Sequence, residues 1–213
     1  RFGKLTMGTV RVRWARHQAY YDQDSWRGTW AMDGGVLTNQ ASHHVDMLEW
    51  MMGDVESVFA KMTTALADVE TEDTAIVTLK FKNGALGIIE ATTATRPVNL
   101  EGSISILGEN GTVVVGGVAV NEMQTWAFED VKDGDSTVLE EFSVNPPNVY
   151  GFGHQAYYEH AVDCIENGSA NLVDGLQGRK SIELISAIYE SAETGKEVFL
   201  KFQPKHCRLG QKS

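Results

Sequence analysis

The clearest candidates for chemistry in this chain are an amide and an imidazole at the start of a predicted helix. Asn39 and His43 stand four residues apart within residues 34–46. A spacing of four places two side chains on one face of a helix. An imidazole, whose ordinary pKa lies near neutrality, can act as acid or base on a sugar hydroxyl, and a neighbouring amide can fix its orientation. The pattern therefore indicates His43 as an acid/base and Asn39 as its partner.

Residue types alone leave a second interpretation of His43 open, a helix N-terminal histidine that bonds only to backbone. A metal site is the third possibility. Zinc-binding helices carry two histidines four residues apart, so that the imidazoles converge, whereas His43 and His44 are adjacent and diverge. His43 and Asp46 together supply only two ligands. No metal site is predicted.

The chain lacks the common signatures of nucleotide and acyl-transfer sites. No strand pattern leads into a Gly-x-Gly-x-x-Gly turn, and neither a phosphate-binding Gly-x-x-x-x-Gly-Lys-Ser/Thr loop nor a Gly-x-Ser-x-Gly elbow occurs. Ser42 and His43 cannot form a triad by adjacency, since neighbours on a helix point about 100° apart. We therefore predict no cofactor-binding residues in this chain.

The elements that must position His43 are a helix over residues 40–52 and a set of strands. The helix places Ala41, Val45, Leu48 and Met52 on one stripe and ends at Gly53. Further helices are predicted at 154–167 and 175–194. Strands are predicted at 5–14, 55–64, 73–82, 85–94, 101–108, 111–116, 118–128 and 197–202.

Short turns join several of these strands, which must then be antiparallel. Asn83-Gly84 supplies a tight hairpin turn, and residues 145–148 form an irregular connection. The expected fold is α+β: one domain over residues 1–213, with a large, mainly antiparallel sheet and helices on one face.

Length and composition describe an ordinary globular protein. The 213 residues are 42% hydrophobic and carry a net charge of −11, which argues against nucleic acid as a partner. No run of 18 apolar residues occurs, so no membrane span is predicted. Residues 1–5 resemble neither a signal peptide nor a natural start, so we expect a fragment. Cys164 and Cys207 show no metal-ligand spacing, which favours a reducing cytoplasm.

The charge is unevenly distributed along the chain. The first 30 residues hold six basic residues against two acidic ones, a net charge of +4. A cationic pocket for an anionic small molecule is one interpretation. The other is that Arg11 and Arg13 form the solvent side of the first strand.

The residues from Gly34 to His43, followed by Asp46, Trp50 and Gly53, resemble the Gfo/Idh/MocA oxidoreductase family, as does the tail from Gly175 to Lys196. The resemblance implies the substrate-binding C-terminal half of such an enzyme, without its Rossmann domain. NAD or NADP would then be bound mainly by a domain absent from this chain. The family's catalytic lysine has no counterpart here, so the chain alone is expected to be inactive.

Residue by residue, His43 matches the family's catalytic histidine, which assists proton removal from the hydroxyl being oxidised. Asn39 stands where many members have Asp, and Ala41 where many have Gly. An amide cannot accept a proton, so the implied role of Asn39 is to position the substrate or the histidine.

A narrower resemblance is to the WlbA/WbpB-like dehydrogenases, which oxidise C3 of UDP-N-acetylglucosaminuronic acid in surface-polysaccharide pathways. It rests on residues 20–23 and 25–30 and on the Asn39 variant of the helix motif. It implies an anionic sugar or sugar-nucleotide substrate, for which Tyr21 and Arg27 are candidate binding residues. Loop packing is the alternative role for both.

The family also implies a homodimer or homotetramer formed through the open face of the sheet. Four apolar residues could supply such a face or belong to the core: Val113, Val115, Trp126 and Phe128. The remaining alternative to an enzyme half is a non-catalytic module for sugar-nucleotide binding or assembly.

Overall fold

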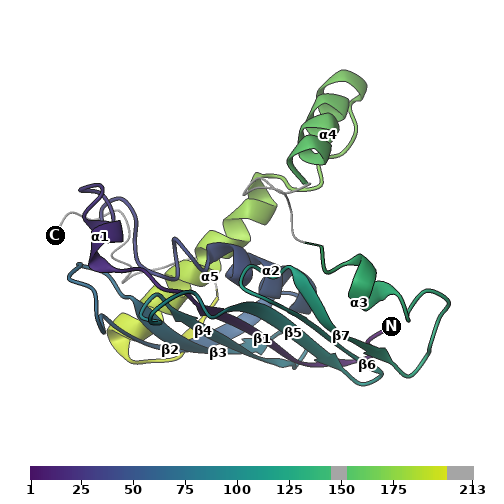
Figure 1. Cartoon of the computed structure of the whole chain (residues 1–213), viewed down its shortest axis with the longest axis horizontal. Coiled ribbons are helices and arrows are strands. Elements are labelled where there is room, and N and C mark those ends of the chain that lie inside the picture. Colours follow the sequence, from purple (N-terminus) through teal and green to yellow (C-terminus); the bar gives the residue numbers. More distant parts are fainter. Residues whose placement is uncertain (145–152, 201–213) are drawn as a thin grey trace.

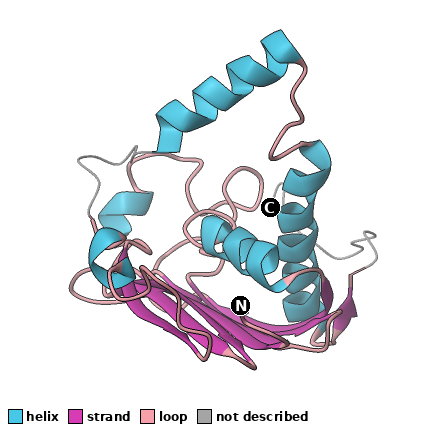
Figure 2. Cartoon of the chain, turned by 90° about the vertical axis from the view of Figure 1, so that its right-hand side faces the viewer, coloured by secondary structure: helices cyan, strands magenta, loops and turns pink. Residues whose placement is uncertain are grey.

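The protein is an eight-stranded sheet with its two best-packed helices on the same face (Figures 1 and 2). The computed structural model describes residues 1–144 and 153–200. Helix α2 (Ser42–Met52) and helix α5 (Gly175–Thr194) lie against the sheet, and none of the described helices covers the opposite face, which is called the bare face below. The predicted α+β fold with a large sheet and helices on one face is confirmed.

The strand order in the sheet is β7-β6-β5-β1-β4-β3-β2-β8. The strands are β1 (Leu5–Arg13), β2 (Val55–Thr63), β3 (Thr74–Phe81), β4 (Leu86–Thr92), β5 (Glu101–Gly108), β6 (Gly111–Gly116), β7 (Glu122–Phe128) and β8 (Val198–Phe199). Among these strands every neighbouring pair is antiparallel except β1 and β4. That parallel pair was not predicted, because the rule for short turns says nothing about strands separated by a long connection.

Two predicted strand boundaries differ from the structure. The predicted strand 118–128 begins only at Glu122, because Gly117 (φ +85°) and Val120 (φ +55°) take left-handed conformations that a strand excludes. The predicted strand 197–202 is described only over Val198–Phe199. Residues 145–148 and Cys207 lie outside the described residues.

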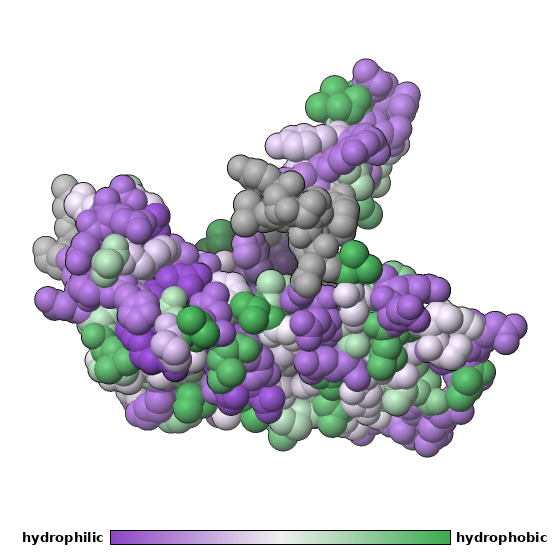
Figure 3. All heavy atoms as spheres, in the orientation of Figure 1, coloured by the Kyte–Doolittle hydropathy of each residue, from purple (hydrophilic) through white to green (hydrophobic). Residues whose placement is uncertain are grey.

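Three further helices complete the described elements: α1 (Gln18–Tyr21), α3 (Val138–Glu141) and α4 (Gly153–Asn167). Helix α4 contains no buried residue and stands away from the sheet (Figures 1 and 3). Among the described residues, no helix combines the length and the apolar composition that crossing a bilayer requires.

The core lies between the sheet and helices α2 and α5. The predicted stripe of α2 is confirmed, since Ala41, Val45, Leu48 and Met52 are all buried. Burying a leucine stabilises a fold by roughly 1.5–3 kcal/mol. Gly8 on β1 lets α2 approach closely, because a Cβ there would lie 2.6 Å from the Met52 side chain. The helix that carries His43 is thus fixed rigidly to the sheet.

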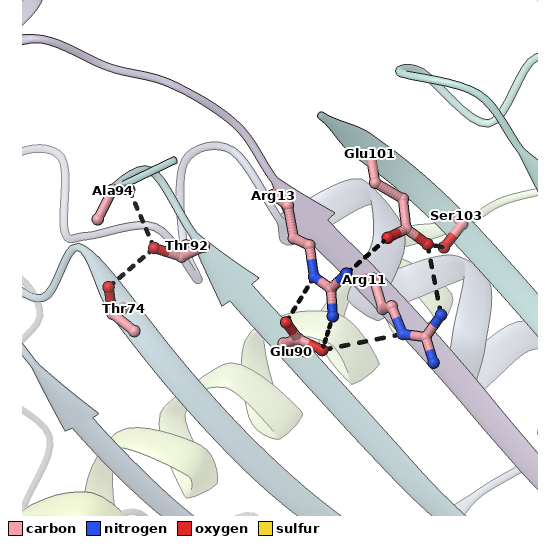
Figure 4. A network of polar contacts seen from close by, with 8 residues as sticks. All are labelled: Arg11, Arg13, Thr74, Glu90, Thr92, Ala94, Glu101 and Ser103. Carbon is pink, nitrogen blue, oxygen red and sulfur yellow. Dashed lines mark hydrogen bonds and ion pairs between the residues drawn. The ribbon is translucent and has the colours of Figure 1, made fainter. Parts of the chain in front are cut away.

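The bare face of the sheet carries an ion-pair network rather than a cationic pocket (Figure 4). Arg13 binds Glu90 at 2.6 Å and Glu101 at 3.1 Å, and Arg11 approaches the same two carboxylates at 3.8 and 3.5 Å. The hydrogen bond from Arg13 holds the pKa of Glu90 below its ordinary value. The interpretation of Arg11 and Arg13 as the solvent side of a strand is therefore correct, and the pocket interpretation is wrong for these two residues.

The four apolar residues considered for an oligomer face lie on the other side of the sheet. Val113 pairs with Ile106, whose side chain is buried with the core. With Val115 and Trp126, Val113 lines an apolar cleft of about 460 Å³ beside the end of α2. Phe128 packs edge-on against Trp126, with ring centroids 5.1 Å apart. These residues face the helix side of the sheet, not its bare face.

Candidate active site

His43 is the second residue of α2, and its ring is exposed. It lines a cavity of about 670 Å³ between α2, α5 and the segment that precedes α5. Within residues 1–144 and 153–200 no hydrogen bond of its ring is found, so the imidazole is available to a ligand. The cavity also contains carboxylates from α2 and the residues after it, and polar side chains from α5: Asp46, Glu49, Asp54, Gln177, Lys180 and Ser181.

Asn39 lies in the turn that precedes α2, not in the helix. The backbone N–H of Asn39 donates to the Gly35 carbonyl, four residues back, as in an α-helix. The backbone N–H of Ala41 donates instead to the Val36 carbonyl, five residues back, which interrupts the α-helical hydrogen-bond pattern. The regular helix begins only at Ser42. The prediction that Asn39 and His43 share one helical face is therefore wrong in its geometry.

A carboxylate that the sequence did not indicate holds the Asn39 side chain. Asp33 accepts a hydrogen bond from Asn39 Nδ2, and its other oxygen accepts the backbone N–H of Gly28 at 2.8 Å. Because only the nitrogen of an amide can donate to a carboxylate, Asn39 Oδ1 is left for another donor. Asn39 therefore presents a hydrogen-bond acceptor.

His44 takes no part in this arrangement. It is 4% exposed, and its ring packs edge-on against Trp14 at a centroid distance of 5.7 Å. Burial, with a smaller effect from the charge of His43, lowers its pKa to about 4, so the ring is neutral near pH 7. No group of three His, Cys, Asp or Glu side chains in the described chain could hold a metal ion.

The carboxylates of the His43 cavity differ strongly in their surroundings. Asp46 accepts a hydrogen bond from Ser181, and Asp54 pairs with Lys180 at 3.0 Å. Glu49 is 8% exposed, and burial raises its pKa to about 7. The cavity thus combines a free imidazole with a carboxyl group that titrates near neutrality.

Tyr21 and Arg27 line a different, smaller cavity of about 370 Å³. Tyr21 is buried, and its hydroxyl bonds to Thr93 at 2.9 Å. The Arg27 guanidinium pairs with Asp24 at 3.1 Å and lies 4.4 Å from the centroid of the Tyr20 ring. These are the contacts of loop packing.

The structure therefore does not gather the four predicted site residues into one cavity. The link between the two cavities is indirect. Gln40, next to Asn39, donates to the hydroxyl of Tyr20 at 3.4 Å, and Tyr20 stacks beneath the Arg27 guanidinium. The loop with Arg27 is thereby attached to the turn with Asn39.

A comparison with models of protein families identifies the family of this chain. The model described as the oxidoreductase family, C-terminal alpha/beta domain, matches residues 1–200. The chain belongs to the Gfo/Idh/MocA family. The resemblance inferred from the residues around His43 is thus confirmed, and the chain corresponds to the C-terminal domain of this family.

Two solved structures are similar over nearly the whole chain. The WlbA dehydrogenases of Chromobacterium violaceum and Bordetella pertussis, each in complex with NADH and UDP-GlcNAcA, are both 46% identical to this chain. Each match covers 95% of this chain, with TM-scores of 0.87 and 0.89, and spans 56% and 58% of those chains.

Among the curated relatives, myo-inositol 2-dehydrogenase of Thermotoga maritima is 28% identical over 177 residues. That match covers 80% of this chain and 50% of the relative. The chain thus spans about half the length of this relative. The similar structures with NADH contain the cofactor in chains much longer than this one.

Proposed function

We propose that this chain is the substrate-side half of an NAD(P)-dependent dehydrogenase that oxidises C3 of a UDP-N-acetylhexosaminuronate. The observation that carries the proposal is the exposed His43 ring over a 670 Å³ cavity, in a chain 46% identical to two enzymes solved with NADH and UDP-GlcNAcA. Because the chain spans little more than half of those enzymes, the activity belongs to a longer protein that also binds the nucleotide cofactor.

In this proposal His43 accepts the proton of the C3 hydroxyl. The nicotinamide cofactor, when bound by the other domain, supplies the acceptor for the hydride that leaves C3. The alcohol loses one proton and one hydride and becomes a ketone. The ring of His43, exposed to the cavity and without a hydrogen bond to any described residue, suits a group that must take up a proton there.

Asn39 has a positioning role in the proposed reaction. Both of its functional atoms are then assigned: Nδ2 donates to Asp33, and Oδ1 accepts a hydrogen bond from the sugar. An amide does not take up a proton near pH 7, so the acid/base role stays with His43.

Arg27 is the cation that we propose for the uronate or the diphosphate, and Tyr21 stays a prediction for substrate contact. Since Arg27 is paired with Asp24, binding an anion there requires exchange of one carboxylate for another. Four acidic residues around the same cavity oppose such an anion: Asp22, Asp24, Asp68 and Glu70. Because Arg27 supplies the positive charge that binds the uronate in this proposal, we expect Arg27→Ala to raise KM for the uronate while kcat changes little.

The test uses the complete gene product that contains this chain. Incubated with NAD or NADP and UDP-GlcNAcA, it is expected to form the reduced cofactor and a product lighter by two hydrogen atoms in mass spectrometry. UDP-GlcNAc, which lacks the carboxylate, is the matched control and is expected to react more slowly. Binding of UDP-GlcNAcA without any reduced cofactor would instead support a non-catalytic module.

We also propose that the bare face of the sheet joins copies of the protein into a homodimer or homotetramer. The bare face carries exposed apolar residues on three neighbouring strands, Phe59 on β2, Ile76 on β3 and Leu86 on β4, and Ile76 pairs in register with Glu90 of the ion-pair network. Light scattering should find a dimer or tetramer that Ile76→Asp dissociates; an unchanged mass would contradict this interface.

A reaction that uses a nucleotide sugar and NAD(P) fits the cytoplasm, which we propose as its location.

A further inference from the structure

A buried carboxyl group lies beneath the turn that leads to Asn39. Glu72, just before β3, is 3% exposed. Its Oε1 accepts the backbone N–H of Leu37 at 3.0 Å and the hydroxyl of Tyr189 at 2.9 Å. The carboxyl thereby joins the turn to helix α5.

Tyr189 holds the same turn from the side of α5. Because its hydroxyl donates to Glu72, it can only accept from its other two neighbours. These are the backbone N–H of Gly35 at 3.3 Å and the hydroxyl of Thr38 at 2.9 Å. The ring is fully buried and packs edge-on against Trp30, with centroids 5.3 Å apart. Every hydrogen-bonding capacity of this hydroxyl is therefore used.

The backbone of Glu72 adds a further link. Its carbonyl accepts the N–H of Val36 at 3.0 Å. The two segments approach so closely that a Cβ at Gly35 would lie 2.1 Å from Glu72 Oε2, so only glycine fits there. The four residues 35–38 are thus each bonded to Glu72 or Tyr189.

No side chain caps the N–H groups at the start of α2, although the Ser42 hydroxyl donates to the Asn39 carbonyl at 3.2 Å within the preceding turn. The N-cap residue of α2 is Ala41, which has no side chain to accept the free N–H groups at the start of the helix. Only three residues separate Asn39 from His43. The position of both side chains therefore depends on the turn that Glu72 and Tyr189 hold.

We propose that Glu72 and Tyr189 are positioning residues that fix Asn39 and His43 for the reaction; their effect on catalysis rests on the function proposed above. Burial raises the pKa of Glu72 to about 7, so the site accommodates the protonated, neutral carboxyl group. Glutamine is a close neutral substitute for that group.

The adjacent residue provides a matched control. Asp73 is 1% exposed, and its carboxylate accepts the N–H groups of Ala65, Leu66 and Ala67 at 2.7, 2.8 and 3.0 Å. It therefore anchors a different loop with comparable hydrogen bonds. If Glu72 and Tyr189 only stabilised the fold, substitution of any of the three residues would affect kcat equally.

The experiment compares Tyr189→Phe, Glu72→Gln and Asp73→Asn in the complete gene product. Tyr189→Phe is expected to lower kcat about tenfold with KM for UDP-GlcNAcA nearly unchanged, because the turn loses two of its bonds. Glu72→Gln keeps an oxygen acceptor for the same two donors and is expected to retain most of kcat. Asp73→Asn is expected to lower stability without lowering kcat.

Hydrogen exchange of residues 35–39, followed by mass spectrometry, is the second measurement. We expect faster exchange in Tyr189→Phe but not in Asp73→Asn. A kcat near the wild-type value in Tyr189→Phe, or an equal loss of kcat in Asp73→Asn, overturns the proposal. If the wild-type protein does not oxidise UDP-sugars, the proposed function fails. Independently of that result, equal hydrogen exchange of residues 35–39 in the two variants overturns the positioning role.

Discussion

Replacing Glu72 by glutamine is expected to change how the stability of the protein depends on pH. The pKa of Glu72 is about 7 in the folded protein, mainly through burial, against an ordinary value of 4.5. Between these two values the unfolded chain releases the proton and the folded protein keeps it. The free energy of unfolding therefore falls as the pH rises through this interval.

The magnitude follows from the two pKa values. A difference of one pKa unit corresponds to about 1.4 kcal/mol, so the full interval corresponds to about 3 kcal/mol. Below an ordinary carboxyl pKa both states are protonated, and the contribution is fully present. It is lost as the pH rises through the folded value near 7. Glutamine does not titrate and removes this dependence.

Urea denaturation followed by tryptophan fluorescence measures the effect. From about pH 5 to about pH 8, the difference in unfolding free energy between E72Q and the wild type should shift by about 2–3 kcal/mol in favour of the variant. Other buried groups, including Glu49 and His44, are present in both proteins, so their titration cancels in the comparison. Parallel curves for the two proteins would refute the assignment of Glu72 as a buried acid.

Further variants test the packing and the site. Gly35→Ala should unfold the protein or lower its stability by several kcal/mol, because the new Cβ meets a buried carboxyl at 2.1 Å, whereas Gly178→Ala in α5 meets no atom within 4 Å and should be neutral or stabilising in a thermal melt. Leu48→Ala, at a fully buried site, should cost about 3 kcal/mol in urea denaturation; a cost below about 1 kcal/mol would contradict the packing of α2. Asp33→Ala releases the amide of Asn39 and should lower kcat about tenfold, and an unchanged kcat would show that this bond does not position Asn39.

Periodicity and turn chemistry predicted most of the fold. The stripe of α2 and the strands at 101–108 and 111–116 appear with the predicted bounds, because alternation and glycine positions are local properties of the chain. The sequence could not say which side of β6 and β7 the helices cover. For that reason the face of Val113 and Trp126 was left open by the sequence.

The site was predictable only in part. The residues around His43 indicated the family correctly, since the motif is contiguous in the chain, and the catalytic role of His43 stays a prediction. Asn39 was placed in the helix because spacing alone cannot reveal that the hydrogen-bond ladder is interrupted at Ala41. The hydrogen bond from Tyr189 to Glu72 joins residues 117 positions apart in the chain, and no local sequence pattern predicts such a contact.

The most direct test of the account is the kcat of His43→Ala in the complete gene product with UDP-GlcNAcA and NAD(P). His17→Ala, which changes an exposed histidine bonded to Pro97 outside the His43 cavity, is the matched control. Loss of a general base should lower kcat by about 10²–10⁴-fold in His43→Ala, while His17→Ala keeps the wild-type rate. A wild-type kcat in His43→Ala would contradict the central claim.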